Sequence, residues 1–204
     1  MLRVALTGGI ATGKTYCLTR LAALGAPVVD ADRLARDAVA PGTPGLSAVV
    51  ARFGPEVLAT SGALDRPRVA AVVFADPDAR RDLERIVHPI VYRGIREWAD
   101  RLAAAGRPLA VADVPLLYET GHDRDFDRVV VVACPPDQQV RRIAERNRLS
   151  EPDARRRLAA QWPVERKRAA ADYVINTGST FEETDRQVED VWRALKRDAA
   201  ARTP

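Results

Sequence analysis

The sequence predicts an α/β fold with a five-stranded parallel sheet. Two observations support this class: short runs rich in β-branched residues alternate with helix-like segments, and a glycine-rich turn joins the first run to the first helix. Runs that are apolar throughout suit strands buried on both faces of a parallel sheet, with helices as crossover connections. The predicted strands cover residues 2–6, 27–30, 109–114, 128–133 and 172–176.

The segments between these strands predict helices. After the glycine-rich turn, Leu18, Leu21 and Leu24 repeat at helical spacing, and Gly25 follows in the usual position of a helix terminator. Residues 33–107 carry helical signals without a convincing strand, and they are too long for an ordinary crossover. We therefore expect a helical subdomain between the second and third strands.

The composition is that of a globular protein. A chain of 204 residues suffices for one well-packed domain, and 47% apolar with 29% charged residues is an ordinary composition. Cys17 and Cys134 are too few for a disulfide framework, so reduced thiols are expected. No leader precedes the first strand and the apolar runs are too short to span a bilayer, so we expect a cytoplasmic protein without a membrane partner.

Positive charge is concentrated in one segment. Residues 141–168 contain ten Arg or Lys and four Asp or Glu, a local charge of +6 against +4 for the whole chain. A focused basic segment favours a compact polyanion over general nucleic-acid binding, although helical arginines are often a solvated face. Aromatic residues that could stack on bases are also few, so no nucleic-acid partner is expected.

The turn "LTGGIATGKT" (Leu6–Thr15) contains a complete phosphate-binding loop, Gly8-x-x-x-x-Gly13-Lys14-Thr15. It follows a strand and opens a helix, which is the context that this motif requires. The glycines let backbone N–H groups surround phosphates, and the helix N-terminus adds partial positive charge. Lys14 is expected to reach the β- and γ-phosphates of ATP, and the Thr15 hydroxyl to help hold Mg²⁺.

Acidic residues end the second and third predicted strands. Asp113 could hold the same metal through water, and a turn- or helix-capping role explains it equally well. In "VVDADRLAR", the i, i+2 spacing of Asp30 and Asp32 places both carboxylates on one face while the strand lasts. A carboxylate beyond the end of a parallel strand can accept the proton of an attacking hydroxyl, although Asp32 could also cap a helix that begins at Arg33.

Several blocks in a fixed order make the chain similar to dephospho-CoA kinases. From Leu6 to Asn176 they are "LTGGIATGKT", "VVDADRLAR", "FGPEVL…GALDR", "VFADP", "HP", "VPLLYE", "RIAER" and "Q…K…ADYVIN". The joint order is specific, above all the phosphate-binding loop followed by D-A-D and V-P-L-L-Y-E. That family transfers the γ-phosphoryl group of ATP to the ribose 3′-hydroxyl of dephospho-CoA, the last step of coenzyme A biosynthesis.

The resemblance implies a P-loop kinase fold related to nucleoside-monophosphate kinases, with a helical acceptor-binding subdomain and a closing lid. We expect a single domain over residues 1–204 with its core at about 1–32, 108–140 and 172–200. The acceptor-binding region then covers about 33–107 and the lid about 141–168. The implied ligands are ATP, Mg²⁺ and dephospho-CoA, with no obligate protein partner.

The resemblance also implies roles for individual residues. Asp32, the second aspartate of D-A-D, is the expected base, and it acts with Lys14. Arg142 and Arg146 match lid positions that stabilise charge on the transferring oxygens, and Thr7 matches a position near the acceptor.

The loop departs from the family pattern at three positions. Ala11 and Thr12 stand where glycine and serine are usual, and Tyr16 stands where a small hydroxyl residue is usual. Backbone donors survive such changes, so ATP binding is still expected. The expected ATP-binding residues are Gly8, Gly9, Ala11, Thr12, Gly13, Lys14, Thr15, Tyr16 and Asn176.

Other polar residues have two interpretations each. His88 could contact the acceptor, but a histidine before proline is more often a structural corner. Glu119 could order the acceptor pocket or satisfy a helix start. Gln161 and Lys167 could contact phosphates, although exposed helical residues usually contact water. Asn176 ends the fifth strand, where related kinases hold adenine with loop backbone.

Two other functions are alternatives to this one. Another small-acceptor kinase, of the nucleotide or shikimate type, shares the loop, but the D-A-D block and the long region 33–107 argue against it. A regulatory GTPase needs an Asn-Lys-x-Asp-type guanine reader after a late strand, and "CPPDQQ" occupies that place.

Overall fold

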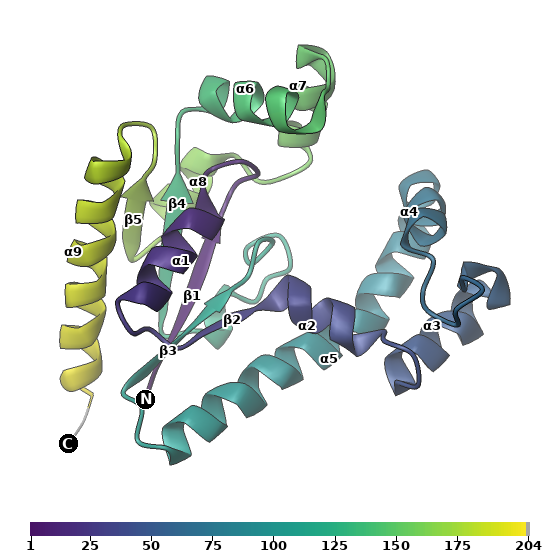
Figure 1. Cartoon of the computed structure of the whole chain (residues 1–204), viewed down its shortest axis with the longest axis horizontal. Coiled ribbons are helices and arrows are strands. Elements are labelled where there is room, and N and C mark those ends of the chain that lie inside the picture. The colour runs from purple at the N-terminus through teal and green to yellow at the C-terminus, as the bar shows by residue number, and fades with distance from the viewer. Residues whose placement is uncertain (203–204) are drawn as a thin grey trace. The chain divides into compact units, whose positions relative to one another are not determined.

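The protein, described here by a computed structural model of residues 1–202, consists of two compact units. The first contains Met1–Val29 together with the described residues from Ala99 onward, and the second contains Asp30–Trp98. Figure 1 labels the helices and strands of both. The first unit carries the sheet and the phosphate-binding loop, whereas the second is helical.

A five-stranded parallel sheet forms the core of the first unit, with the order β2-β3-β1-β4-β5 (Figure 1). Its strands are β1 (Leu2–Gly8), β2 (Val28–Asp30), β3 (Leu109–Asp113), β4 (Arg128–Ala133) and β5 (Tyr173–Asn176). The predicted fold class is confirmed, and every strand lies close to its predicted bounds. β1 is central, so the loop that follows it emerges between β3 and β4.

Alternate residues of these strands face opposite sides of the sheet. Leu2, Val4 and Leu6 of β1 are buried in the main apolar core together with residues of α1 and α9. In the parallel register Asp113 is the partner of Leu6, so its side chain points to this α1 side. Thr7, one residue later, points to the other side. The polar residues at this end of the sheet are therefore divided between its two faces.

The other long elements of the described chain are helices. They are α1 (Lys14–Ala23), α2 (Ala31–Ala38), α3 (Pro44–Phe53), α4 (Arg66–Ala75), α5 (Pro77–Ala104), α6 (Pro136–Asn147), α7 (Glu151–Ala159), α8 (Val164–Ala169) and α9 (Phe181–Ala200). α1 ends as predicted, with Gly25 at φ 94° just beyond the C-cap Leu24. None of the described helices has the length and apolarity that a membrane crossing needs.

The helical unit has an apolar core of its own. Its buried residues are Val39, Val49, Val57 and Val69. α3 and α4 each begin with a capping side chain, Thr43 and Asp65, followed by proline in the first turn. Between β2 and β3 the chain forms helices and one isolated bridge, Leu58 to Leu64.

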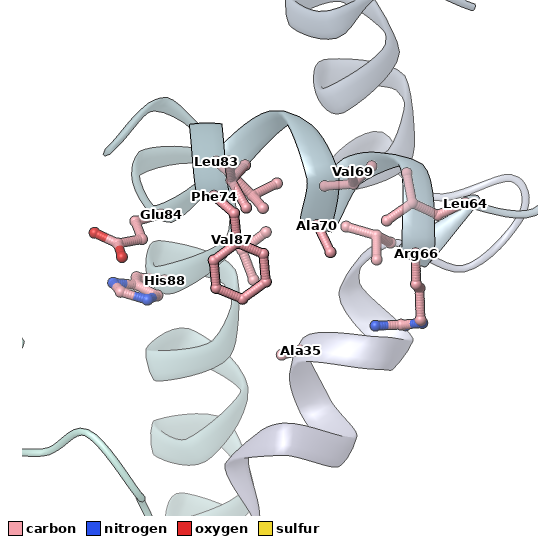
Figure 2. Close-up of a pocket in the computed structure, with 12 residues that line it drawn as sticks. Ala35, Leu64, Arg66, Val69, Ala70, Phe74, Leu83, Glu84, Val87 and His88 are labelled. Atoms are coloured by element: carbon pink, nitrogen blue, oxygen red, sulfur yellow. The ribbon is translucent and has the colours of Figure 1, made fainter. Parts of the chain in front are cut away.

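An apolar pocket of about 410 Å³ lies within the helical unit (Figure 2). α2, α4 and α5 line it, and Figure 2 shows Glu84 and His88 on one side and Arg66 on the other. Phe74, which also lines the pocket, is 88% exposed.

His88 lies inside α5 and not at a corner. α5 continues through Pro89, so the structural-corner interpretation is wrong. A proline in a helix interior removes one backbone hydrogen bond and crowds the preceding turn. Apolar residues at helical spacing on both sides, Val87, Val91 and Ile95, are partly or fully buried, and their packing offsets that cost. The His88 ring meets the Tyr92 ring edge-on at 6.3 Å.

Candidate phosphate-transfer site

The phosphate-binding loop connects Gly8, the last residue of β1, to Lys14, the first of α1. Two of its residues have positive φ, Ala11 (60°) and Gly13 (83°). Gly13 is the N-cap of α1, and within the described chain no side chain caps the first N–H groups of this helix. Those groups are free to bind an anion, because the first turn of a helix provides them no carbonyl partner.

Every backbone carbonyl of the loop, from Gly8 to Gly13, accepts a hydrogen bond from the protein. Side chains outside the loop supply four of these bonds: Lys167 to Gly8 (3.5 Å), Gln139 to Ile10 (2.7 Å), Arg142 to Ala11 (3.3 Å) and Thr177 to Thr12 (2.5 Å). Thr12 donates to the Gly9 carbonyl, and the Cys17 N–H donates to that of Gly13.

These bonds determine the direction of the loop's N–H groups. In a trans peptide the N–H points opposite to the carbonyl of the preceding residue. The carbonyls of Ile10, Thr12 and Gly13 are turned outward to their donors, so the N–H groups of Ala11, Gly13 and Lys14 are turned inward. Inward N–H groups together with the dipole of α1 form a cradle for phosphate oxygens.

The first two glycines of the loop are closely packed. A Cβ atom on Gly8 would lie 2.5 Å from the Val132 carbonyl oxygen, and one on Gly9 would lie 2.5 Å from the Gln139 amide nitrogen. The Val132 carbonyl is backbone of β4, so Gly8 must lack a side chain, whereas the Gln139 amide is the end of a flexible side chain that can shift to admit a Cβ atom on Gly9.

Lys14 and Asp113 form an ion pair on the α1 side of the sheet. Both side chains are largely buried, with 15% and 6% of their surface exposed. Thr15, the next residue of α1, is exposed. The sheet register thus places a lysine, a carboxylate and a hydroxyl at the opening of the loop.

The two predicted lid arginines have different contacts. Arg142 binds backbone, with Nη1 donating to Ala11 O and Nη2 donating to Thr177 O at 3.0 Å. Its Nη1 also lies 3.6 Å from Cys134 Sγ. Burial raises the pKa of the Cys134 thiol, and the nearby guanidinium lowers it in part. Arg146, one turn further along α6, is exposed, and its Nε donates to Asn147 Oδ1.

α6 and α7 lie beyond the carboxyl ends of β1 and β4 (Figure 1) and pack on the loop. Val140, Ile143 and Ala154 form a small buried cluster, against which Ile10 and Ala11 of the loop pack. Part of the basic charge of this segment is paired internally, since Arg155 pairs with Glu151 and Arg156 with Asp153.

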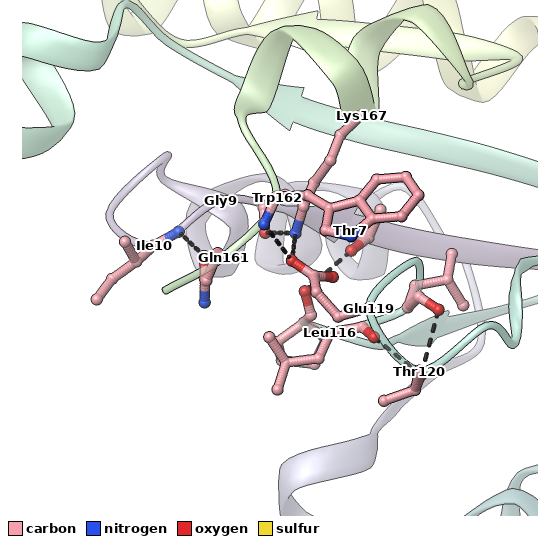
Figure 3. A network of polar contacts seen from close by, with 12 residues as sticks. Thr7, Gly9, Ile10, Leu116, Glu119, Thr120, Gln161, Trp162 and Lys167 are labelled. Atoms are coloured by element: carbon pink, nitrogen blue, oxygen red, sulfur yellow. Dashed lines mark hydrogen bonds and ion pairs between the residues drawn. The ribbon is translucent and has the colours of Figure 1, made fainter. Parts of the chain in front are cut away.

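On the other side of the sheet, a second polar group surrounds Glu119 (Figure 3). Glu119 Oε1 lies 2.8 Å from Lys167 Nζ and accepts the backbone N–H of Trp162 at 2.9 Å. Its Oε2 is buried and has no hydrogen-bond partner among the described residues. Thr7 is fully buried and its hydroxyl donates to the Pro115 carbonyl. Lys167 is 0% exposed, so of its two interpretations the one in which it contacts water is wrong.

Tyr16 and Asn176 lie on two segments at the edge of the loop. The Tyr16 hydroxyl donates to Asp185, and its ring packs on Phe181 at 5.0 Å between centroids. Asn176 ends β5, as predicted, and its side chain accepts the N–H of Gly178 in a tight turn. Thr177, which follows it, binds the loop at Thr12, so this turn lies against the phosphate-binding loop.

Asp30 and Asp32 are not on one strand face. β2 ends at Asp30 and α2 begins at Ala31, so Asp32 lies in the first turn of a helix. The helix cap is Asp30, whose Oδ1 accepts the N–H groups of Asp32 (2.8 Å) and Arg33 (3.4 Å). The capping role suggested for Asp32 therefore belongs to Asp30. Asp32 itself is exposed.

The sequence did not single out several residues that hold the loop. Gln139 and Thr177 bind the loop directly from positions more than a hundred residues away. The backbone N–H of Trp162 binds Glu119, which in turn pairs with Lys167 beside the loop. A glutamine or threonine on a surface-like helix or loop has no local pattern that predicts such a contact. Only the order of the strands brings these segments to the same end of the sheet.

A parallel sheet with a phosphate cradle after its central strand, helices α6 and α7 packed on the cradle and a separate helical unit define the chain as a P-loop kinase. The model of the dephospho-CoA kinase family matches residues 2–183. The chain belongs to the dephospho-CoA kinase family.

Individual relatives agree with this assignment. A dephospho-CoA kinase of Anaeromyxobacter dehalogenans is 55% identical over 177 residues, covering 86% of this chain and 84% of the relative. A dephospho-CoA kinase of Streptomyces avermitilis is 48% identical over 195 residues, covering 96% of this chain and 94% of the relative. Among solved structures, TT1252 from Thermus thermophilus superposes with a TM-score of 0.79 at 34% identity, covering 95% of this chain and 97% of that one. The family resemblance and the five-stranded P-loop kinase fold expected from it are confirmed.

Proposed function

We propose that this chain transfers the γ-phosphoryl group of ATP to the ribose 3′-hydroxyl of dephospho-CoA, giving coenzyme A and ADP. Membership of the family supports the acceptor, and the cradle with its outward carbonyls supports the donor. In this reaction the hydroxyl oxygen bonds to the γ-phosphorus, the bond from that phosphorus to the β–γ bridging oxygen breaks, and the hydroxyl proton passes to a base.

The donor site consists of the loop and its neighbours. Backbone N–H groups between Gly8 and Thr15 bind the β- and γ-phosphates, with Gly9, Ala11, Thr12 and Gly13 shaping the cradle. Lys14 leaves Asp113 partly or wholly to reach the same phosphates. Tyr16 and the turn after Asn176 border the nucleoside, since both lie at the edge of the cradle.

Thr15 is the proposed ligand of Mg²⁺, with Asp113 acting through water. The described residues contain no group of three or more His, Cys, Asp or Glu side chains suited to a metal. This fits Mg²⁺, which keeps several waters and is held by a few protein oxygens together with substrate phosphates. When bound, the ion neutralises charge on the phosphate oxygens.

Asp32 is the proposed base, and it accepts the proton of the acceptor hydroxyl. Its exposure at the start of α2, with the cap formed by Asp30, leaves its carboxylate available for this role.

Arg146 is exposed on α6 and is proposed to stabilise charge on the transferring oxygens. Arg142 is proposed to act with it, although its donors are bound to loop backbone in this conformation.

The helical unit and the far side of the sheet are proposed to bind the acceptor. The apolar pocket beside His88 has the size to take part of a ligand. Thr7 and Glu119, whose Oε2 can accept one further hydrogen bond, are proposed to contact the acceptor as well. We further propose an acceptor region over about 33–107, a lid over about 141–168, a cytoplasmic location, and no nucleic-acid, membrane or obligate protein partner.

One assay tests the reaction. ADP release is measured with Mg-ATP and, in separate reactions, dephospho-CoA, AMP and shikimate. Release that depends on dephospho-CoA alone supports the proposal, whereas turnover with AMP or shikimate instead would assign the chain to another small-acceptor kinase.

Limited proteolysis around Arg148–Arg157 tests the lid: cleavage should slow when both substrates are present. A cleavage rate that ligands do not change would argue against closure.

A further inference from the structure

A lysine ammonium group is buried beneath the phosphate-binding loop. Lys167 of α8 is 0% exposed, and its Nζ lies 2.8 Å from Glu119 Oε1 and 3.5 Å from the Gly8 carbonyl oxygen. Burying two charges costs several kcal/mol per ion, and their attraction repays this only with good geometry. The presence of this buried pair beside the loop is therefore weak evidence that it stabilises the fold.

Glu119 joins two segments that are distant in sequence, its own and residues 162–167. Its Oε1 receives both the Lys167 ammonium group and the Trp162 N–H, while Glu119 itself follows β3. Figure 3 shows Lys167 reaching from α8 to this carboxylate, with Trp162 beside it. The Trp162 ring is stacked on Tyr118 at 5.7 Å, and the Arg166 guanidinium lies over it at 3.4 Å.

The residue before Trp162 carries this arrangement to the loop. Gln161 Oε1 accepts the N–H of Ile10 at 2.8 Å (Figure 3). The Ile10 carbonyl is already held by Gln139, so both polar groups of this loop residue are fixed by side chains from other segments. The first half of the loop is therefore held at two points, at Gly8 by Lys167 and at Ile10 by Gln161.

We infer that Lys167, paired with Glu119, is a positioning residue for phosphoryl transfer. Its ammonium group keeps the Gly8 carbonyl turned away from the cradle, and its pairing with Glu119 fixes the Gln161–Trp162 segment on Ile10. Direct phosphate binding is not its role, since its Nζ is buried against Glu119 and loop backbone. This inference rests on the proposed binding of ATP phosphates by the loop.

The test compares Lys167→Met with Arg168→Met. Methionine is one atom shorter than lysine, keeps its unbranched apolar stem and removes its charge. Arg168 is an exposed residue of the same helix that pairs with Glu165. Calorimetric titration measures ATP binding without acceptor, and kinetics gives kcat and KM. Lys167→Met should weaken ATP binding and lower kcat/KM for ATP by about 10²-fold, because small displacements of a binding group can cost that much. Arg168→Met should match the unaltered chain.

A double variant separates positioning from folding. Lys167→Met alone leaves the Glu119 carboxylate buried without its partner, which destabilises the fold. Glu119→Gln with Lys167→Met removes both charges while the glutamine oxygen still accepts the Trp162 N–H. We expect this variant to recover the thermal midpoint of the unaltered chain but to keep the weakened ATP binding.

Two results would overturn the inference. The first is ATP binding in the double variant that recovers together with its thermal midpoint, because the pair would then serve stability only. The second is a Lys167→Met variant that folds and binds ATP normally. An unaltered chain that binds no ATP would instead refute the proposed donor site, which keeps the two failures distinct.

Discussion

The two units of the molecule hold their functional residues in different ways. In the first, the loop backbone is fixed by donors from α6, α8 and the turn after β5, and even its buried lysine is paired. In the second, Asp32 is exposed in a helical turn, Phe74 is largely open to water, and many of the ion pairs are short-range pairs on helix surfaces. The loop of the first unit is therefore held in one conformation by many contacts, whereas Asp32 and Phe74 of the helical unit are open to water. The predictions below test this contrast.

The largest effect is expected from Asp32→Asn. Loss of a positioned base lowers kcat by about 10²–10⁴. ATP binding should stay nearly unchanged, because Asp32 belongs to the helical unit and the cradle is held without it. Steady-state kinetics and calorimetric titration with ATP measure the two quantities. A turnover number equal to that of the unaltered chain would remove Asp32 from this role.

Gly8→Ala tests whether the cradle is as tightly packed as its contacts indicate. The new Cβ atom would meet the Val132 carbonyl oxygen at 2.5 Å, so the loop backbone must move. We expect kcat/KM for ATP to fall by about 10²-fold. Gly94→Ala is the matched control, because a Cβ atom there meets only Leu34 at ordinary distances in the interior of α5. It should raise stability by about 0.5–1 kcal/mol, and a Gly8→Ala variant that behaves likewise would contradict the close packing.

Arg142→Ala and Arg146→Ala separate loop support from charge stabilisation. Hydrogen bonds from charged donors contribute about 1.5–3 kcal/mol, which corresponds to about 10–100-fold. Arg142→Ala should weaken ATP binding and slow transfer, since it frees the carbonyls of Ala11 and Thr177. Arg146→Ala should lower kcat alone. If Arg142→Ala changed kcat without affecting ATP binding, Arg142 would act on the transferring group as proposed, and its bonds to the loop backbone would not be needed for ATP binding.

Phe74→Ala tests whether the pocket in the helical unit receives the acceptor. Loss of about 1 kcal/mol of apolar contact should raise KM for dephospho-CoA about fivefold and leave KM for ATP unchanged. Stability should change by less than about 0.5 kcal/mol, because the side chain is mostly exposed. Phe181→Ala, at an exposed phenylalanine of the first unit, is the control and should not affect KM for dephospho-CoA. Equal effects of both variants would argue against this pocket.

Ala11→Gly should have the smallest effect. Ala11 has φ 60°, where a Cβ atom costs about 1–2 kcal/mol and glycine costs nothing. Glycine also gives the unfolded chain more freedom, which lowers stability by about 0.4–1 kcal/mol. We expect the free energy of unfolding to rise by a net amount of about 0.5 kcal/mol, which a higher thermal midpoint would show. Arg148→Gly also removes a Cβ atom from a residue with positive φ (52°), outside the loop, and should stabilise similarly. A loss of stability at Ala11 alone would show that its methyl contact with α6 and α7 outweighs the strain.

The fold was predictable because its strands are marked locally. Runs such as "RVVVVA" are apolar throughout, and the loop motif identifies which strand precedes the first helix. The errors arose where local pattern and tertiary packing disagree. Spacing placed Asp32 on a strand that ends two residues earlier, and proline at position 89 suggested a corner where a long helix continues.

The candidate site was predictable only in part. The motif identifies the residues of the loop itself, because phosphate binding requires that spacing. The residues that hold the loop are not identified in this way, since Lys167 belongs to a six-residue basic helix that has the composition of an exposed surface. Its burial depends on Glu119, which reaches it from the segment after β3. The assignment of catalytic and acceptor-binding residues stays a prediction.

The hydrogen bonds that turn the loop carbonyls outward also bear on how the molecule assembles. The four side-chain donors that come from outside the loop lie between 129 and 165 positions further along the chain. A nascent chain cannot complete its nucleotide cradle until β5 and the turn after it have been synthesised and have paired. Contacts between such distant positions form late and slow folding. Nucleotide affinity therefore reports on the integrity of the whole sheet, and a truncated product that ends before β5 would carry the motif without being able to use it.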